Sequence, residues 1–229
     1  MATKEIAFYT MGDTRSVKGA KAVIDGKKQT VKISKMWKLR AHSLAGTGLT
    51  YGVGTVDAAI LQLQNLAKET ELTKVFFVGH GFGDNEGGYV LSGTPEGDEG
   101  FTTTSEKTLS VLAEQKMKDF CKKLAPYLSR KDEVEIAFLS CYTGTGKFTG
   151  RFYKELRGQG VKKLKVGAYK DFYETVFNTD ARGNITGWAD RVVDSKNKVV
   201  AKAGSNGIPP YQVTHKEINL DDAPSWMKL

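Results

Sequence analysis

One stretch constrains the fold more than any other: residues 133–147, with the sequence EVEIAFLSCYTGTGK. Its apolar run from Val134 to Leu139 is interrupted only by Glu135, and turn-forming residues follow at 143–146. A short run of this kind, rich in branched and aromatic side chains, is typical of a buried strand in an α/β sheet. Cys141 is therefore expected at the carboxyl end of a core strand, where ligands gather in open α/β sheets.

A second apolar run, residues 74–78 (KVFFV), ends in the same manner, with Gly79, His80 and Gly81 directly after it. The chain thus presents two buried strands, one ending in a histidine and the other in a cysteine. If these strands are neighbours in a parallel sheet, His80 and Cys141 face each other across one sheet edge.

The rest of the chain alternates expected strands and helices. Apolar residues at helical spacing predict helices over residues 56–68, 109–124 and 148–157, the first with Thr55 as its N-cap. Strands are expected at 5–10, 89–91, 165–169, 184–188, 190–194 and 199–200, with a hairpin over 22–34 and a flexible connection over 45–54. Residues 93–107 are expected to form a mobile loop beside the site, with a passive surface insertion as the alternative. The alternation predicts an α/β fold, mostly parallel, with short antiparallel additions.

Length and composition favour one domain and a reducing compartment. With 229 residues, 40% of them hydrophobic, the chain can bury a full core, so a single domain over 1–229 is the economical interpretation. Residues 1–50 then form a basic N-terminal extension or hairpin of unplaced role. Two cysteines do not make a disulfide framework, and no histidine has metal-ligand spacing. No membrane span or secretory signal is visible, which favours the cytoplasm, with release without a signal peptide as the alternative.

The net charge of +8 is unevenly distributed. Residues 1–50 carry ten Lys/Arg against three Asp/Glu, and residues 121–170 carry twelve against four, whereas residues 51–120 carry five against eleven. Solvated helix faces and loops explain this distribution, and a basic surface that attracts a polyanion is the alternative. No nucleic-acid motif or aromatic stacking platform accompanies the basic residues, so no nucleic-acid partner is expected.

The two strand ends carry residue types that suit nucleophilic catalysis. A cysteine nucleophile needs thiolate character, an acid that protonates the leaving group, and donors for a developing oxyanion. Cys141 and His80 supply the first two, and the N–H groups of Gly81 and Cys141 are candidate oxyanion donors. Alternatively, Cys141 is a small buried hydrophobe and His80 an ordinary turn residue.

These residues also carry a family resemblance. The order of apolar strand, His-Gly, polar spacer, apolar strand and Cys resembles the caspase-like (clan CD) cysteine peptidases, and LSCYTGTG is similar to CHAT-type members. The resemblance implies a three-layer sandwich in which His80 is the acid/base, Cys141 the nucleophile, and Gly81 and Cys141 the oxyanion donors. The run departs from the Gln-Ala-Cys-x-Gly of caspases proper.

The part after Cys141 more loosely resembles the self-processing cysteine protease domains of bacterial toxins, on Gly183, Trp188 and residues 197–199 (NKV). Those domains are activated by an inositol polyphosphate held in a basic pocket, which implies the same activator here. The basic groups at 122–123, 130–131 and 162–165 are the candidates. Their alternative role is to complement helix dipoles at nearby helix ends.

Substrate preference is expected to depend on two positions near the cysteine. Many relatives carry an acidic or amide residue two positions before the cysteine, in the S1 pocket, but this chain carries Leu139 there. We therefore expect an uncharged P1 preference, with an Arg/Lys preference through Asp171 as the alternative. At the level of function, the sequence favours a cysteine endopeptidase that acts on a protein or peptide substrate. The alternative is a catalytically silent binding or scaffold module with the same fold.

Overall fold

A computed structural model describes most of the chain. The described residues are 4–11, 13, 15–24, 27–46, 48–82, 88–90, 100–102, 109–182, 185–203 and 207–216. Of the predicted mobile loop, residues 93–107, only the strand β8 (Gly100–Thr102) falls within these ranges, so its mobility lies outside the described residues.

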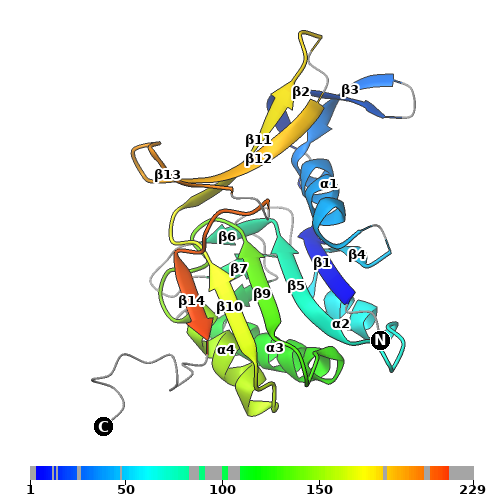
Figure 1. The fold of residues 1–229 in the computed structure, drawn as a ribbon, viewed down its shortest axis with the longest axis vertical. Coiled ribbons are helices and arrows are strands. Elements are labelled where there is room, and N and C mark those ends of the chain that lie inside the picture. The colour runs from blue at the N-terminus through cyan, green and yellow to red at the C-terminus, as the bar shows by residue number, and fades with distance from the viewer. Residues whose placement is uncertain are drawn as a thin grey trace.

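The fold is mixed α/β and is organised around one six-stranded sheet in the order β14-β10-β9-β5-β1-β4 (Figure 1). All neighbouring pairs are parallel except β10 with β14. The strands are β1 (Lys4–Thr10), β4 (Thr50–Val53), β5 (Leu72–Val78), β9 (Val134–Leu139), β10 (Leu164–Ala168) and β14 (Val213–Lys216). The two apolar runs of the sequence, β5 and β9, are neighbours at the centre of the sheet.

Three helices cover one face of this sheet. They are α2 (Val56–Gln64), α3 (Leu109–Leu124) and α4 (Phe148–Gly158), and a short 3-10 turn, η1 (Ala125–Tyr127), follows α3. Because strand side chains alternate, Phe8, Phe77 and Phe138 point to this face, where they join Phe120 and Phe152 in one aromatic core. The thiol of Cys121 on α3 is fully buried there.

The opposite face is covered by the helix α1 (Ile33–Ala45), which contacts β1, β4 and β5. Its Trp37 and Ala41 pack with Ala7, Phe76 and Val78 from the sheet. This helix was not predicted, although its apolar residues stand at helical spacing. The flexible connection expected over residues 45–54 is wrong, because Thr50–Val53 is the strand β4, paired in parallel with β1.

Small antiparallel sheets surround the core. They are β2 (Ser16–Ile24) with β3 (Lys27–Lys32); β6 (His80–Phe82) with β7 (Gly88–Val90) and β8; and β11 (Phe172–Thr179) with β12 (Ile185–Val193) and β13 (Val199–Lys202). The predicted hairpin over 22–34 corresponds to β2–β3, although β2 begins earlier and β3 ends earlier than expected. Figure 1 shows the long β11–β12 hairpin extending away from the central sheet toward β2 and β3.

A row of charges crosses the sheet near the amino ends of its strands. In register across four strands lie Glu5, Lys74, Glu135 and Lys165. Lys74 binds Glu5 at 2.8 Å and Lys165 binds Glu135 at 3.4 Å, all with side chains 23–43% exposed. Opposite charges side by side on one face stabilise the pairing of adjacent strands.

Among the described helices, none combines the length and the hydrophobicity that crossing a membrane requires.

Candidate active site

The register of the sheet aligns the two predicted site residues. Val78 of β5 pairs with Leu139 of β9, and His80 and Cys141 each follow two residues after this pair. Both residues therefore lie at the same sheet edge, as the sequence predicts.

The turns that carry these two residues are in direct contact at Gly81. A Cβ at this position would lie 2.1 Å from the carbonyl oxygen of Cys141 and 2.3 Å from Oγ1 of Thr143. Such distances are far below contact distance, so only glycine lets the His80 turn approach the Cys141 loop this closely.

The loop after Cys141 is fixed by hydrogen bonds to the end of β10. The N–H of Tyr142 donates to the carbonyl oxygen of Asp171 (3.1 Å), and the N–H of Gly144 donates to that of Tyr169 (2.7 Å). Tyr142 has a φ of 57°, in the left-handed region that side-chain-bearing residues seldom adopt. A strained residue directly after the candidate nucleophile is a feature that clusters at functional sites.

The Cys141 thiol is half-buried in the resting structure. Its Sγ donates to the carbonyl oxygen of Tyr173 on β11 at 3.4 Å. Burial raises the pKa of this thiol to about 11; the carboxylate of Glu174 adds to the rise, and the main chains of Tyr173 and Cys141 oppose it. The thiol, not the thiolate, is therefore the resting form at neutral pH.

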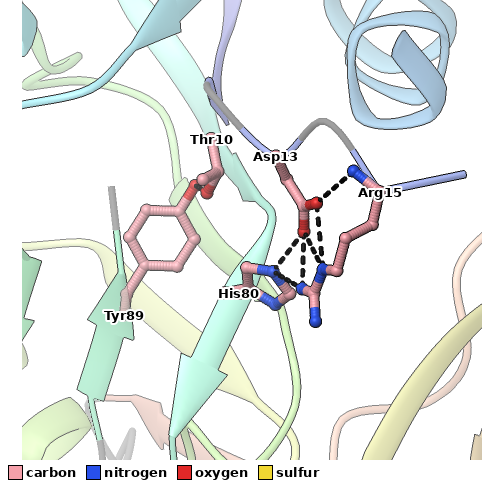
Figure 2. A network of polar contacts seen from close by, with 5 residues as sticks. All are labelled: Thr10, Asp13, Arg15, His80 and Tyr89. Atoms are coloured by element: carbon pink, nitrogen blue, oxygen red, sulfur yellow. Dashed lines mark hydrogen bonds and ion pairs between the residues drawn. The ribbon is translucent and has the colours of Figure 1, made fainter. Parts of the chain in front are cut away.

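His80 is held by neighbours that come from the N-terminal fifth of the chain. Its Nε2 lies 2.9 Å from Oδ2 of Asp13, and its ring stands edge-on to Trp37 of α1 at a centroid distance of 4.5 Å. Figure 2 shows the Asp13 carboxylate between His80 and Arg15. The same figure shows Thr10, at the end of β1, and Tyr89 of β7, whose hydroxyl oxygens are 3.4 Å apart.

Asp13 is a buried carboxylate with strong cationic support. Its side chain is 1% exposed, and the Arg15 guanidinium reaches both of its oxygens, with the shortest contact at 2.6 Å. Burial alone would raise the pKa of Asp13, but hydrogen bonds from Arg15 and His80 outweigh it and lower the pKa to about 2. Asp13 is therefore ionised throughout the physiological range.

This carboxylate also decides which tautomer of His80 is favoured. Nε2 also lies 3.0 Å from Nη2 of Arg15. If Nε2 carries the proton, it donates to Asp13; if it does not, it accepts from Arg15. A proton on Nε2 agrees with the lowered pKa of Asp13, to which a hydrogen bond from His80 contributes. Nδ1 is then the basic nitrogen of the neutral ring.

The helix α1 fixes the segment that carries Asp13. The N–H of Ile33 donates to the carbonyl oxygen of Arg15 (2.9 Å), and the N–H of Ser34 donates to that of Asp13 (3.2 Å). Sequence reasoning did not identify Asp13 as a site residue. The available signal was its place directly after the first predicted strand, at the edge where His80 and Cys141 were expected.

The two predicted substrate-binding residues are both engaged in the fold. The Leu139 side chain is 1% exposed and packs in the core on the α1 face. Asp171 lies close to the Cys141 loop, but its Oδ2 accepts a hydrogen bond from Nε2 of Gln212 (2.6 Å). Gln212 in turn accepts from the N–H groups of Lys170 and Asp171.

The predicted basic groups of residues 121–170 gather at the opposite edge of the sheet. The carbonyl oxygen of Lys163 accepts from the N–H of Val134 at the start of β9, while Cys141 follows the end of β9. Two of these cations bind main-chain carbonyl oxygens: Arg130 binds those of Ala125 and Gln159, and Lys163 binds that of Lys131. The contacts of Arg130 with the carbonyl groups near the ends of two helices agree with the helix-end role; the polyphosphate activator stays a prediction.

Within the described part of the chain, no three His, Cys, Asp or Glu side chains gather in a group able to hold a metal ion. Comparison of the chain with protein-family models, with curated proteins and with solved structures finds no match in any of the three.

Proposed function

We propose that this chain is a cysteine endopeptidase in which Cys141 is the nucleophile, His80 the general acid/base and Asp13 the residue that orients His80. The observation that carries the proposal is the contact at Gly81, which brings the His80 turn against the Cys141 loop at one sheet edge. The ionised, buried Asp13 beside His80 supports it, because a third group that orients the base is typical of such sites.

In the proposed reaction, His80 takes the proton of the Cys141 thiol and the sulfur attacks the carbonyl carbon of the scissile peptide. The N–H groups of Gly81 and Cys141 are proposed to stabilise the oxyanion that forms. The C–N bond then breaks, and the proton on His80 passes to the leaving amine. Water releases the acyl group from the thioester, with His80 again as the base.

A caspase-like fold is part of the same proposal. A parallel sheet with helices on both faces, and with the His-Gly and Cys turns on adjacent strand ends, agrees with what the motif resemblance implies. For the substrate we propose a peptide with an uncharged P1 residue, because the Asp171 carboxylate is engaged by Gln212 and the buried Leu139 offers no charge to a substrate. Strong P1 Arg selectivity that is lost in Asp171→Asn would contradict this choice.

A second candidate is a binding module whose cysteine is silent. The half-buried thiol with its raised pKa favours it, since reactive cysteines have lowered pKa values and exposed sulfurs. As a peptidase, the protein must expose and deprotonate Cys141 when the substrate binds.

The deciding experiment compares purified full-length variants on a peptide library, with cleavage detected by mass spectrometry. We expect Cys141→Ala and His80→Ala to lose hydrolysis, and Asp13→Asn to lower it roughly 10²- to 10⁴-fold, the range of general acid–base catalysis. Cys121→Ala is the matched control, because it removes the other thiol from the helical core and should stay active. Hydrolysis that survives Cys141→Ala would refute the peptidase; absence of hydrolysis in the wild type under all conditions would favour the binding module.

A further inference from the structure

A buried ion pair joins α1 to the β11–β12 hairpin. Nε of Arg40 donates to Oδ2 of Asp190 at 2.7 Å, and the two side chains are 5% and 0% exposed. Asp190 also accepts from the hydroxyls of Tyr173 (2.5 Å) and Thr175 (2.7 Å), so its charge is fully hydrogen-bonded. Arg40 additionally donates to the carbonyl oxygen of Gly207 (2.5 Å). The proposed chemistry uses none of these groups.

Tyr173 links this pair to the Cys141 thiol. Its hydroxyl is bound to Asp190, while its main-chain carbonyl oxygen accepts the hydrogen bond from Sγ of Cys141. Its ring packs against that of Tyr169 at a centroid distance of 4.9 Å, and the residue is 9% exposed. Tyr173 is thus anchored at its hydroxyl by Asp190 and carries on its main chain the carbonyl group that holds the thiol.

The helix α1 contacts both halves of the candidate site. Trp37 packs against the His80 ring, and Arg40, one helical turn later, reaches Asp190. Residues three apart on a helix lie on the same face, so one rigid element supports the histidine directly and the cysteine through Asp190 and Tyr173.

We propose that Arg40 and Asp190 are positioning residues that hold β11 over Cys141, so that the thiol stays covered and bound to Tyr173 in the resting protein. The inference concerns the state of the thiol and does not depend on peptidase activity. It predicts that loosening this network makes Cys141 more reactive.

The size of the effect follows from the cause of the raised pKa. Burial is its largest cause, so release of β11 lets the pKa of Cys141 fall from about 11 toward its ordinary value of 9.0. At pH 8 complete release would raise the thiolate fraction by about 100-fold, since each pKa unit is a factor of ten. Loss of the single Tyr173–Asp190 hydrogen bond should give about a threefold to tenfold increase, because one such bond is a modest part of the network.

The test measures alkylation by iodoacetamide from pH 6 to 11 on the full chain, with each cysteine quantified by peptide mass spectrometry. Tyr173→Phe removes one hydroxyl and keeps the ring, and Asp190→Asn weakens the pair itself. Tyr211→Phe is the matched control: its hydroxyl also binds a carboxylate, Glu135 at 2.6 Å, near the start of β9. Cys121 reports unfolding, because its fully buried thiol reacts only when the core opens.

We expect faster Cys141 alkylation at pH 8 and a lower pH midpoint in Tyr173→Phe, a larger change in Asp190→Asn, wild-type behaviour in Tyr211→Phe, and a protected Cys121 throughout. If Asp190→Asn exposes Cys121, it has unfolded, and Tyr173→Phe alone decides. A Cys141 midpoint and rate in Tyr173→Phe equal to those of the wild type would overturn the proposal. A wild-type midpoint at or below pH 8 would overturn it too.

Discussion

Gly81→Ala is the most direct test of the contact between the two turns. The added methyl would stand 2.1 Å from the Cys141 carbonyl oxygen and 2.3 Å from Oγ1 of Thr143. The Thr143 hydroxyl is fully buried and also bound to the carbonyl oxygen of Gly88 (3.0 Å), so neither neighbour is a flexible chain end that can move aside. One turn or the other must shift by more than 1 Å to restore an ordinary contact distance.

We expect a cost of about 1–3 kcal/mol in the free energy of unfolding, the range for overpacking a well-packed site. We also expect loss of peptide hydrolysis, because a shift of about 1 Å between reacting groups is enough to lower the rate by roughly 100-fold. Urea unfolding followed by tryptophan fluorescence measures the first quantity, and the peptide assay measures the second.

Gly54→Ala is the matched control. A methyl at this position meets no atom within 4 Å, so the same substitution there should leave both quantities near those of the wild type. If Gly81→Ala behaves like Gly54→Ala, the two turns are not in contact and the reasoning that joins His80 to Cys141 fails.

Three further predictions rest on charges. Because the pKa of Asp13 is lowered to about 2 from an ordinary 3.8, its stabilising contribution is full above about pH 4 and is lost as the pH falls through 2. Over this pH range the free energy of unfolding should fall by about 2 kcal/mol less in Asp13→Asn than in the wild type, which acid unfolding measures. Arg40→Leu leaves the buried Asp190 carboxylate without its cation, and we expect it to cost about 3–5 kcal/mol in urea unfolding, with a value below 1 kcal/mol contradicting the burial of the pair. Inositol hexakisphosphate should leave Cys141 alkylation unchanged, because the basic groups at 130–131 and 162–165 lie at the opposite sheet edge. A change that survives high salt would support the activator role implied by the toxin-domain resemblance.

The sequence predicted the sheet centre and the helices α2, α3 and α4, because their apolar patterns are strong and local. The positions of His80 and Cys141 followed from the same patterns, since parallel strands bring their carboxyl ends to one edge. Asp13 escaped prediction because it lies 67 residues from its partner in an irregular segment, and its role depends on tertiary contact with α1.

The strand β11 was missed for a related reason. Its residues 172–179 (FYETVFNT) include the threonines and the glutamate of a half-exposed hairpin, and the apolar alternation is weak. As a result, neither the contact of Tyr173 with Cys141 nor the burial of the Cys141 thiol was predicted. Burial of a cysteine by a strand distant from its own loop leaves no local trace in the sequence.

The row of alternating charges at the amino ends of the strands has a consequence for the opposite edge. A parallel sheet whose strands are apolar on both faces tolerates a slip of two residues, because the same face stays buried and Val, Ile and Phe replace one another. Such a slip would place Lys74 beside Ala137 and carry Cys141 about 7 Å along the strand axis away from His80, at about 3.3 Å per residue. That slip would also take Lys74 of β5 away from Glu135, the oppositely charged residue that is its register partner on β9. The row of charges therefore helps to keep His80 and Cys141 level from the other end of their strands.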